Sequence, residues 1–167
     1  MTKFWLGAVI SVFSFQAVIA QDIVAKHDGA KLSGKVNYIT ESVVVFTPQG
    51  EKKSFKLGKA EVEKITYKSG RTEYVTPKIE INGREDWEKV SMTTNPLQVI
   101  GLSKKGEIKA KSDRQNQGLA SFDTRALKKM KKDAADMHAH VILIKPYDGR
   151  EETGSKNKME TLVVYGY

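Results

Sequence analysis

Short strand-like segments separated by turn signals fill the chain from residue 22 to residue 75. In "KLSGKVNYI" apolar and polar side chains alternate, which is the pattern of a strand with one face in water. "SVVVFT" is a nearly continuous apolar run, as expected of a strand that is covered on both sides. Five such strands in roughly 55 residues, all joined by short turns, predict a small closed antiparallel β-barrel over residues 21–76.

Gly34 lies inside the second of these predicted strands. A glycine in a strand interior weakens the strand, because it has no side chain to pack and loses more backbone entropy on folding than other residues do. We therefore expect a strong bend, or the close approach of another backbone, at Gly34.

A turn, a bent strand with an internal glycine, a buried strand and a last strand follow one another in this half. The stretches are Asp28-Gly29, Gly34-Lys35-Val36, Val43-Val44-Val45 and the closing Val62, Ile65 and Tyr67. This order resembles the small SH3-like barrels, among them the Sm-like type, and the barrel modules of exported Bacteroidetes proteins of unknown function. Sm-like RNA-binding proteins carry an Asp–Asn signature in one loop and an Arg-Gly or Lys-His signature near the end. The matching stretches here are "FTPQG" and "TYKSG", so no RNA site is carried over to this chain.

The least regular stretch, residues 77–87, is expected to be a linker between two units. Pro77 has no N–H to donate to a strand ladder, and Asn82 followed by glycine is a turn signal. Trp87 is expected to pack either between the two units or in the core of the second one, and the sequence favours neither alternative.

Residues 88–167 combine strand patterns with one helix. "KVSMTT", "LQVIGL", "EIKAKS", "HVILI" and "METLVVYGY" are the expected strands, and "DTRALKKMKKDAADMH" is the expected helix. Asp123 is a good helix N-cap, because its carboxylate can accept hydrogen bonds from the free amides of the first turn. An apolar stripe at helical spacing follows, formed by Leu127, Met130, Ala134 and Met137. The whole chain is therefore expected to be α+β, with a small N-terminal β-barrel followed by one main helix packed on an antiparallel or mixed sheet.

The helix and the strands that follow it carry a second family pattern. "ALKKMKKDAADMHAHVILI" followed by "LVVYGY" resembles the small α+β domain of enteric envelope stress-sensor lipoproteins and of YbjQ-like proteins, over roughly residues 88–167. The turn glycine of that family is His138 here, and its asparagine is His140. The family's cysteines and lipid anchor are absent, so its disulfide-dependent signalling does not transfer. The resemblance implies a role in envelope homeostasis.

The opening stretch, residues 1–20, has the features of a cleaved signal peptide. Lys3 precedes an apolar run, and Ala20 is the small residue before the expected cut. The run is about a dozen residues long, which is short of the roughly 20 that a membrane-spanning helix needs. The chain has no cysteine to carry a lipid. We therefore expect a periplasmic or secreted protein that is not a lipoprotein and that has no transmembrane segment after cleavage.

Formal net charge is +8, which suits contact with anionic surfaces of the envelope. The densest basic cluster is "KKMKK", and its lysines are candidates for contact with acidic glycans or lipid headgroups. The alternative is that these lysines form the solvated face of an amphipathic helix. The expected partner is an envelope protein or an anionic envelope surface, and nucleic acid is not expected because the chain is predicted to be exported. The candidate residues are Lys128, Lys129, Lys131 and Lys132.

"HAH" at residues 138–140 is the one stretch with metal-ligand chemistry. On a strand, side chains two residues apart share a face, so His138 and His140 would be able to hold one metal ion together. Asp136 or His27 would have to supply further ligands. The alternative is that His138 lies at the end of the helix, where a cation suits the helix dipole, while His140 fills a position in the sheet.

Motifs for catalysis are missing from the sequence. The serines lack a G-x-S-x-G elbow, and no phosphate-binding glycine loop occurs. We therefore expect a non-enzyme without a cofactor. The leading hypothesis is an exported, non-catalytic envelope protein that acts as a binding or adaptor module. The alternatives are a metal-binding protein that uses the His-Ala-His stretch and an Sm-like nucleic-acid binder.

Overall fold

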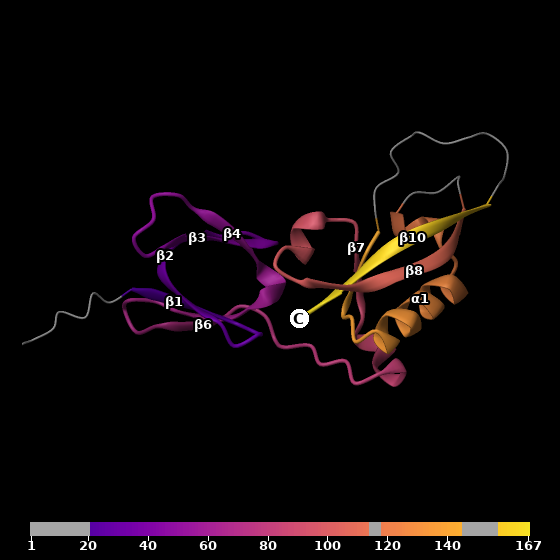
Figure 1. The fold of residues 1–167 in the computed structure, drawn as a ribbon, viewed down its shortest axis with the longest axis horizontal. Helices are drawn as coiled ribbons and strands as arrows, with labels where there is room; N and C mark the ends of the chain where they lie inside the picture. Colours follow the sequence, from indigo (N-terminus) through magenta and orange to yellow (C-terminus); the bar gives the residue numbers. More distant parts are fainter. Residues whose placement is uncertain (1–20, 114–117, 145–156) are drawn as a thin grey trace, which may run out of the picture.

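A computed structural model describes residues 21–113, 118–144 and 157–167. These residues form two β-sheets that lie side by side along the long axis of the molecule, with one α-helix on the second sheet (Figure 1). The predicted α+β class is confirmed. The predicted signal peptide, residues 1–20, lies outside the described residues. None of the helices in the described ranges is long and apolar enough to span a bilayer.

The first sheet contains six antiparallel strands in the order β4-β3-β2-β1-β5-β6. Its core is a cluster of buried side chains that includes Val24, Phe46 and Ile65, which are almost completely covered. A short 3-10 helix, η1, joins the fourth and fifth strands. The elements are β1 (Asp22–Lys26), β2 (Lys31–Ile39), β3 (Val43–Pro48), β4 (Phe55–Gly58), η1 (Lys59–Glu61), β5 (Val62–Thr66) and β6 (Thr72–Tyr74).

The first sheet curls around its core but does not close into the expected barrel, and it has six strands rather than five. Within the described residues β4 and β6 are its two edges, and no ladder joins them. Both edge strands are short, with four and three residues. After β6 the chain runs through Pro77 toward the second sheet (Figure 1). Proline has no N–H to donate, so this segment is poorly suited to extend β6 into a closing ladder.

Gly34 confirms the expectation of a close backbone approach. A Cβ atom added at this position would lie 2.2 Å from the carbonyl oxygen of Thr47 and 2.9 Å from Cα of Pro48. The glycine therefore allows the backbones of β2 and β3 to approach closely at this position.

The second sheet has the strand order β7-β9-β10-β8, in which β7 pairs with β9 in parallel and the other pairs are antiparallel. The helix α1 covers one face of this sheet (Figure 1), and its buried side chains meet those of β8, β9 and β10. The elements are η2 (Arg84–Lys89), β7 (Ser91–Thr93), η3 (Pro96–Val99), β8 (Ser103–Asp113), η4 (Gly118–Ser121), α1 (Thr124–Asp136), β9 (Val141–Leu143) and β10 (Asn157–Gly166).

The helix α1 begins as the sequence predicts. The side chain of Asp123 accepts a hydrogen bond from the backbone N–H of Ala126, at 2.6 Å. Met130 and Ala134 are buried, as the stripe predicts. Met137 is not: its side chain is 38% exposed, because the helix ends one residue earlier and Met137 has left the helical conformation.

The predicted strand "LQVIGL" is wrong, because the segment begins with the 3-10 helix η3. The side chain of Asn95 accepts a hydrogen bond from the N–H of Leu97 at 2.9 Å, and Pro96 occupies the first helical position. These two features favour a helical turn over an extended strand.

The predicted linker, residues 77–87, lies against the second unit. Ile81 is buried in the core of that unit, and Trp87 packs on the same core. The structure thus favours the second of the two positions that the sequence leaves open for Trp87. The helix η2, which contains Trp87, contacts α1.

The two sheets touch through η1 and the segment that follows η3. A Cβ atom added at Gly58 would lie 1.9 Å from the carbonyl oxygen of Ile100, which shows how closely the two backbones approach. The amide of Asn95 donates a hydrogen bond to the hydroxyl of Ser42 at 3.1 Å. Buried Glu61 pairs with Lys26 at 2.7 Å and lies against the backbone of Gly101. We call this contact the inter-sheet interface.

Candidate functional site

His138 stands just beyond the end of α1 in a left-handed backbone conformation, with φ of 54°. Its Nδ1 atom lies 2.8 Å from the carbonyl oxygen of Ile81, and the residue is exposed. The ring therefore ties the end of the helix to the segment between the two sheets.

His140, in contrast to His138, is buried. The residue is 2% exposed, and its backbone N–H donates to the carbonyl oxygen of Tyr165 at 3.0 Å. The metal hypothesis assumes that His138 and His140 lie on one strand. The strand β9 begins only at Val141, so neither histidine is part of it.

The further ligands that the metal hypothesis needs lie elsewhere. Asp136 pairs with Arg84, and Nε2 of His27 lies 3.0 Å from the hydroxyl of Thr76. Within the described ranges no three histidine or carboxylate side chains are grouped so that they could hold a metal ion. Metal binding by His138 and His140 stays a prediction.

The four lysines of "KKMKK" take different positions on α1. Lys128 extends over the ring of Trp87, with Nζ 4.9 Å from the ring centroid. Lys129 is exposed and faces a groove beside the helix, whereas Lys131 and Lys132 are half-buried. The four side chains therefore do not form one common surface.

The groove beside Lys129 has a volume of about 280 Å³ and lies between α1, β8 and the start of β10. Its apolar lining includes Met130 and Met159, and Met159 is 61% exposed. Asp123, which also lines the groove, already accepts the capping hydrogen bond of α1. We call this site the basic groove, because its cationic lining consists of Lys109, Lys111, Arg125 and Lys129.

Three of these four cations, Lys109, Lys111 and Arg125, were not among the residues predicted from the sequence. Lys109 and Lys111 alternate with buried Ile108 and Ala110 along β8, and this alternation is visible in "EIKAKS". It indicates that both lysines share a face. Their closeness to Arg125 and Lys129 depends on how β8 and α1 pack, which the sequence pattern does not contain.

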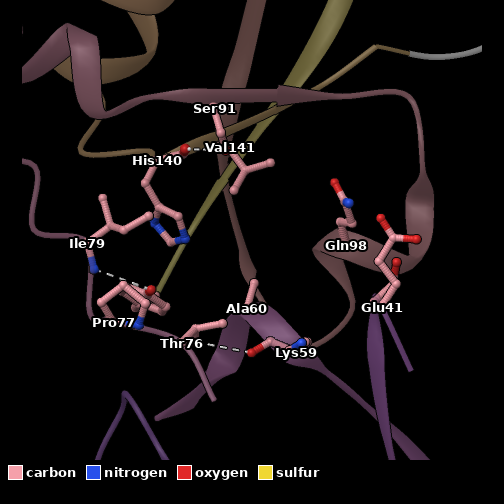
Figure 2. A pocket seen from close by; sticks show the side chains of 12 residues that line it. Glu41, Lys59, Ala60, Thr76, Pro77, Ile79, Ser91, Gln98, His140 and Val141 are labelled. Atoms are coloured by element: carbon pink, nitrogen blue, oxygen red, sulfur yellow. Dashed lines mark hydrogen bonds between the residues drawn. The ribbon is translucent and has the colours of Figure 1, made fainter. Parts of the chain in front are cut away.

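A second hollow, of about 240 Å³, lies at the inter-sheet interface, and we call it the inter-sheet cleft (Figure 2). Lys59 and Thr76 come from the first unit, whereas Ser91, His140 and Val141 come from the second. Figure 2 shows the ring of His140 pointing into this space, near Ile79. The remaining lining residues are Glu41, Ser42, Ala60, Pro77, Gln98 and Tyr167.

Three rings are in contact beside the cleft. The ring of Tyr167 is tilted against that of His140, at 4.2 Å between centroids, and against that of His27, at 4.7 Å. These contacts join the two units, because His27 follows β1 and His140 precedes β9.

Burial lowers the pKa of His140 to about 4, and the positive charges of His27 and Lys105 add to this effect. Burial also lowers the pKa of His27. Both rings are therefore neutral at pH 7, and neither adds charge to the cleft.

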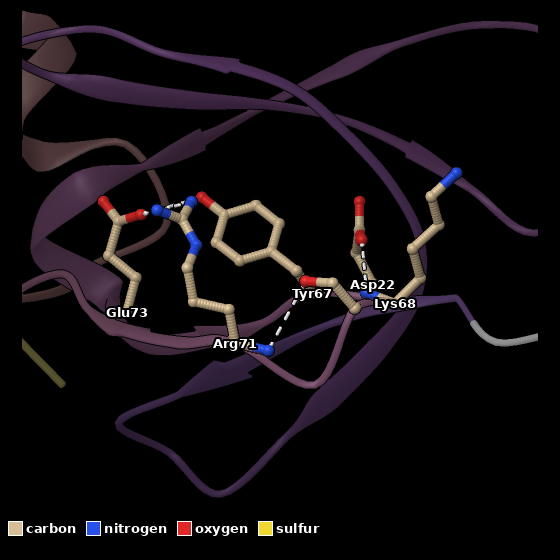
Figure 3. Close-up of polar contacts among 6 residues, drawn as sticks. Asp22, Tyr67, Lys68, Arg71 and Glu73 are labelled. Carbon is tan, nitrogen blue, oxygen red and sulfur yellow. Dashed lines mark hydrogen bonds and ion pairs between the residues drawn. The ribbon is translucent and has the colours of Figure 1, made fainter.

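A group of polar side chains around the start of β1 and the turn between β5 and β6 has a structural role (Figure 3). The buried carboxylate of Asp22 accepts hydrogen bonds from the N–H groups of Val36 and Lys68, at 2.8 and 2.9 Å. The guanidinium of Arg71 lies 4.5 Å from the ring of Tyr67, whose hydroxyl donates to Glu73 at 2.9 Å. Asp22 thus fixes β1 to β2 and to the turn after β5.

Comparison with protein-family models gives no match to this chain, and comparison with curated proteins and with solved structures gives none either. The resemblances to SH3-like barrels and to the envelope stress-sensor domain therefore stay predictions.

Proposed function

We propose that this chain is an exported, non-catalytic binding module of the cell envelope, periplasmic or secreted. Its basic groove binds the headgroups of an anionic membrane surface. Export is the expectation drawn from residues 1–20. The partner is identified by chemistry, as a surface of phosphate-bearing lipid headgroups.

The observation that carries this proposal is the charge around the groove. Lys109, Lys111, Arg125 and Lys129 have no ion-pair partner within the described parts of the chain. Cations that lie close together repel one another, and this repulsion is relieved when an anion binds between them. Phosphate is well suited, because arginine forks and lysine ammonium groups both bind it.

The apolar part of the groove supports a lipid rather than a free anion. Met159 and Met130 lie beside the cations, and Met159 is largely exposed. A flexible thioether side chain next to basic groups suits the boundary between lipid headgroups and acyl chains.

The chemistry of the groove also supports a non-catalytic role. Its polar groups are four cations and one carboxylate, and that carboxylate caps α1. Such a set can hold a negative charge, whereas the carboxylate that would have to accept a proton already accepts the capping hydrogen bond of α1.

Co-sedimentation of residues 21–167 with lipid vesicles tests the proposal. Binding to vesicles that contain phosphatidylglycerol is expected at low salt, with little binding to pure phosphatidylcholine and a loss at high salt as charges are screened. The triple variant Lys109→Gln/Lys111→Gln/Lys129→Gln should bind about 100-fold more weakly, because each lysine near an anionic surface contributes about 1 kcal/mol.

The matched control is Lys52→Gln/Lys53→Gln/Lys56→Gln, which removes the same charge from exposed positions in β4 and in the turn before it. It should bind nearly as well as the unchanged protein. Equal weakening by both triple variants would mean that only net charge matters, and the groove would then have no special role. Tighter binding to a short RNA than to the vesicles would favour the Sm-like alternative instead.

A further inference from the structure

The inter-sheet cleft contains a buried polar atom without a partner. Nε2 of His140 has no hydrogen-bond partner, and it is the only buried side-chain nitrogen or oxygen of this kind in the described ranges. Most buried polar groups in proteins are hydrogen-bonded, so an orphaned one calls for an explanation. A ligand that enters the cleft is one such explanation, since His140 lines it.

The ring cannot easily swing out to reach water. The backbone N–H of His140 bonds to Tyr165, and its carbonyl oxygen accepts from both the N–H and the hydroxyl of Ser91, at 2.9 and 3.1 Å. On one side the ring is covered by Tyr167. The phenol of Tyr167 is itself only half-buried, and its hydroxyl accepts a long hydrogen bond of 3.4 Å from the N–H of Ile79. Tyr167 is therefore the side chain that can move aside.

The other polar groups deep in the cleft already have partners. The hydroxyl of Thr76 bonds to the carbonyl oxygen of Val62 at 2.7 Å, and that of Ser42 accepts from Asn95. The charged groups of Glu41 and Lys59 have opposite signs and supply no net charge to the lining. Among the described residues that line the cleft, His140 thus holds the one buried side-chain nitrogen or oxygen that has no partner and is left to recognise a polar atom of a ligand.

The volume limits the size of a ligand. An apolar cavity of about 150 Å³ is enough to hold benzene in other proteins. The cleft, at about 240 Å³, has room for one ring with a substituent. Its walls include Ala60, Pro77, Ile79 and Val141, which suit an apolar body of that size.

We propose that the inter-sheet cleft binds a small uncharged molecule that has a ring-sized apolar body and one hydroxyl group, and that this hydroxyl hydrogen-bonds to Nε2 of His140. The inference is independent of the basic groove.

A hydroxyl group fits His140 for a simple chemical reason. A neutral imidazole donates from one nitrogen and accepts at the other, and a hydroxyl can both donate and accept. It therefore satisfies Nε2 in either tautomer. The low pKa of His140 keeps the ring neutral at pH 7, so the site has no buried cation that would select an anionic ligand.

Phenol and toluene are the probes for this site, because they differ only in the group that would meet Nε2. Titration of each into ¹⁵N-labelled residues 21–167, followed by NMR, should show saturable shifts at Ala60, Thr76 and Val141 with phenol. Toluene should bind about tenfold more weakly, since one hydrogen bond to a buried group is lost.

Three variants make the test specific. His140→Phe should remove the preference for phenol over toluene while leaving toluene binding unchanged or stronger. Ala60→Met should fill the cleft and weaken both probes. His138→Asn, which suits the left-handed backbone and lies outside the cleft, should change neither. Equal affinity for phenol and toluene in the unchanged protein would overturn the proposal, and so would an absence of binding or shifts confined to other surfaces.

Discussion

His140 combines burial with a site for protonation. Its ring lies in the inter-sheet cleft against Tyr167, and its pKa is about 4 rather than the usual 6.5 or so. The fold therefore stabilises the neutral ring over the charged one. The stability of the whole protein therefore depends on pH through the protonation of this one residue.

Lowering the pH from 7 to 4 should destabilise the protein through His140. In the unfolded chain the ring binds a proton near pH 6.5, whereas in the folded protein it does so only near pH 4. Between these values the unfolded state binds more protons, so the free energy of unfolding falls as the pH falls. We expect this residue to account for a loss of about 1–3 kcal/mol, after allowance for solvent screening.

Urea unfolding of the unchanged protein and of His140→Phe at pH 7, 5.5 and 4 measures this loss. The stability of His140→Phe should fall less with pH, because its ring does not titrate. His27 and the carboxylates are present in both proteins and cancel in the comparison. If the free energy of unfolding changes with pH equally in both proteins, protonation of His140 does not destabilise the fold and the prediction is wrong.

Among the elements, α1 covers one face of the second sheet. Met130, at 1% exposure, and the adjacent small residues Ala134 and Ala135 form the face that packs on the sheet. The two alanines let the helix approach closely, which leaves Met130 as the one large and fully buried side chain of α1.

Met130→Ala should lower the free energy of unfolding by about 2–5 kcal/mol, because it removes a large buried side chain and leaves a cavity. Lys129→Ala, on the exposed face of the same turn, should cost less than about 0.5 kcal/mol. Urea melts of both variants compare the two costs. Similar small losses would mean that α1 does not pack on the sheet through Met130.

The elements also show where sequence reasoning succeeds and where it stops. The strand-rich first half, the cap at Asp123 and the close approach at Gly34 follow from local patterns and were predicted, although the first sheet has one strand more than expected. The segment after Asn95 was misread because its apolar residues suit a strand, whereas Asn95 and Pro96 start a helical turn. The open edges of the first sheet depend on contacts between distant segments, which a local pattern does not contain.

The same limit applies to the candidate sites. Lys129, His138 and His140 were chosen from short clusters, and such clusters say nothing of what lies across the fold. The partners of His140 come from distant parts of the chain: Tyr167 covers its ring, and Ser91 holds its carbonyl oxygen. The basic groove likewise joins β8 to α1. Packing between distant segments creates both sites.

At the scale of the whole molecule, the inter-sheet interface decides whether the two units behave as one body. Gly58 approaches the carbonyl oxygen of Ile100 so closely that no side chain fits between them. The interface also forms the cleft and holds His140 near Tyr167. Its packing therefore links the stability of both sheets to the shape of a candidate site.

Gly58→Ala should separate the two units, because the added methyl group would meet backbone atoms that cannot move away individually. We expect a loss of about 1–3 kcal/mol, as for other overpacked sites. After removal of residues 1–20, Trp87 is the only tryptophan, and it reports on the second unit. Unfolding followed by its fluorescence should coincide with circular dichroism in the unchanged protein but not in Gly58→Ala.

Lys56→Ala, at an exposed position in the same strand, is the control and should change stability by less than about 0.5 kcal/mol. Coincident transitions in Gly58→Ala, with unchanged stability, would show that the two units do not depend on the close contact at Gly58.

The strand order has a consequence for how the protein acquires its structure during synthesis. The first sheet needs only residues 22–74, and most of its strands pair with a neighbour in the sequence. In the second sheet β10 lies between β8 and β9, although it is the last of the described strands along the chain. Domains fold as units while a chain emerges, so the first sheet can form early.

The second sheet must wait for residues 157–166, and until then β8 and β9 lack the strand that pairs with both. During that interval the incomplete sheet is the part of the molecule that most needs protection from aggregation.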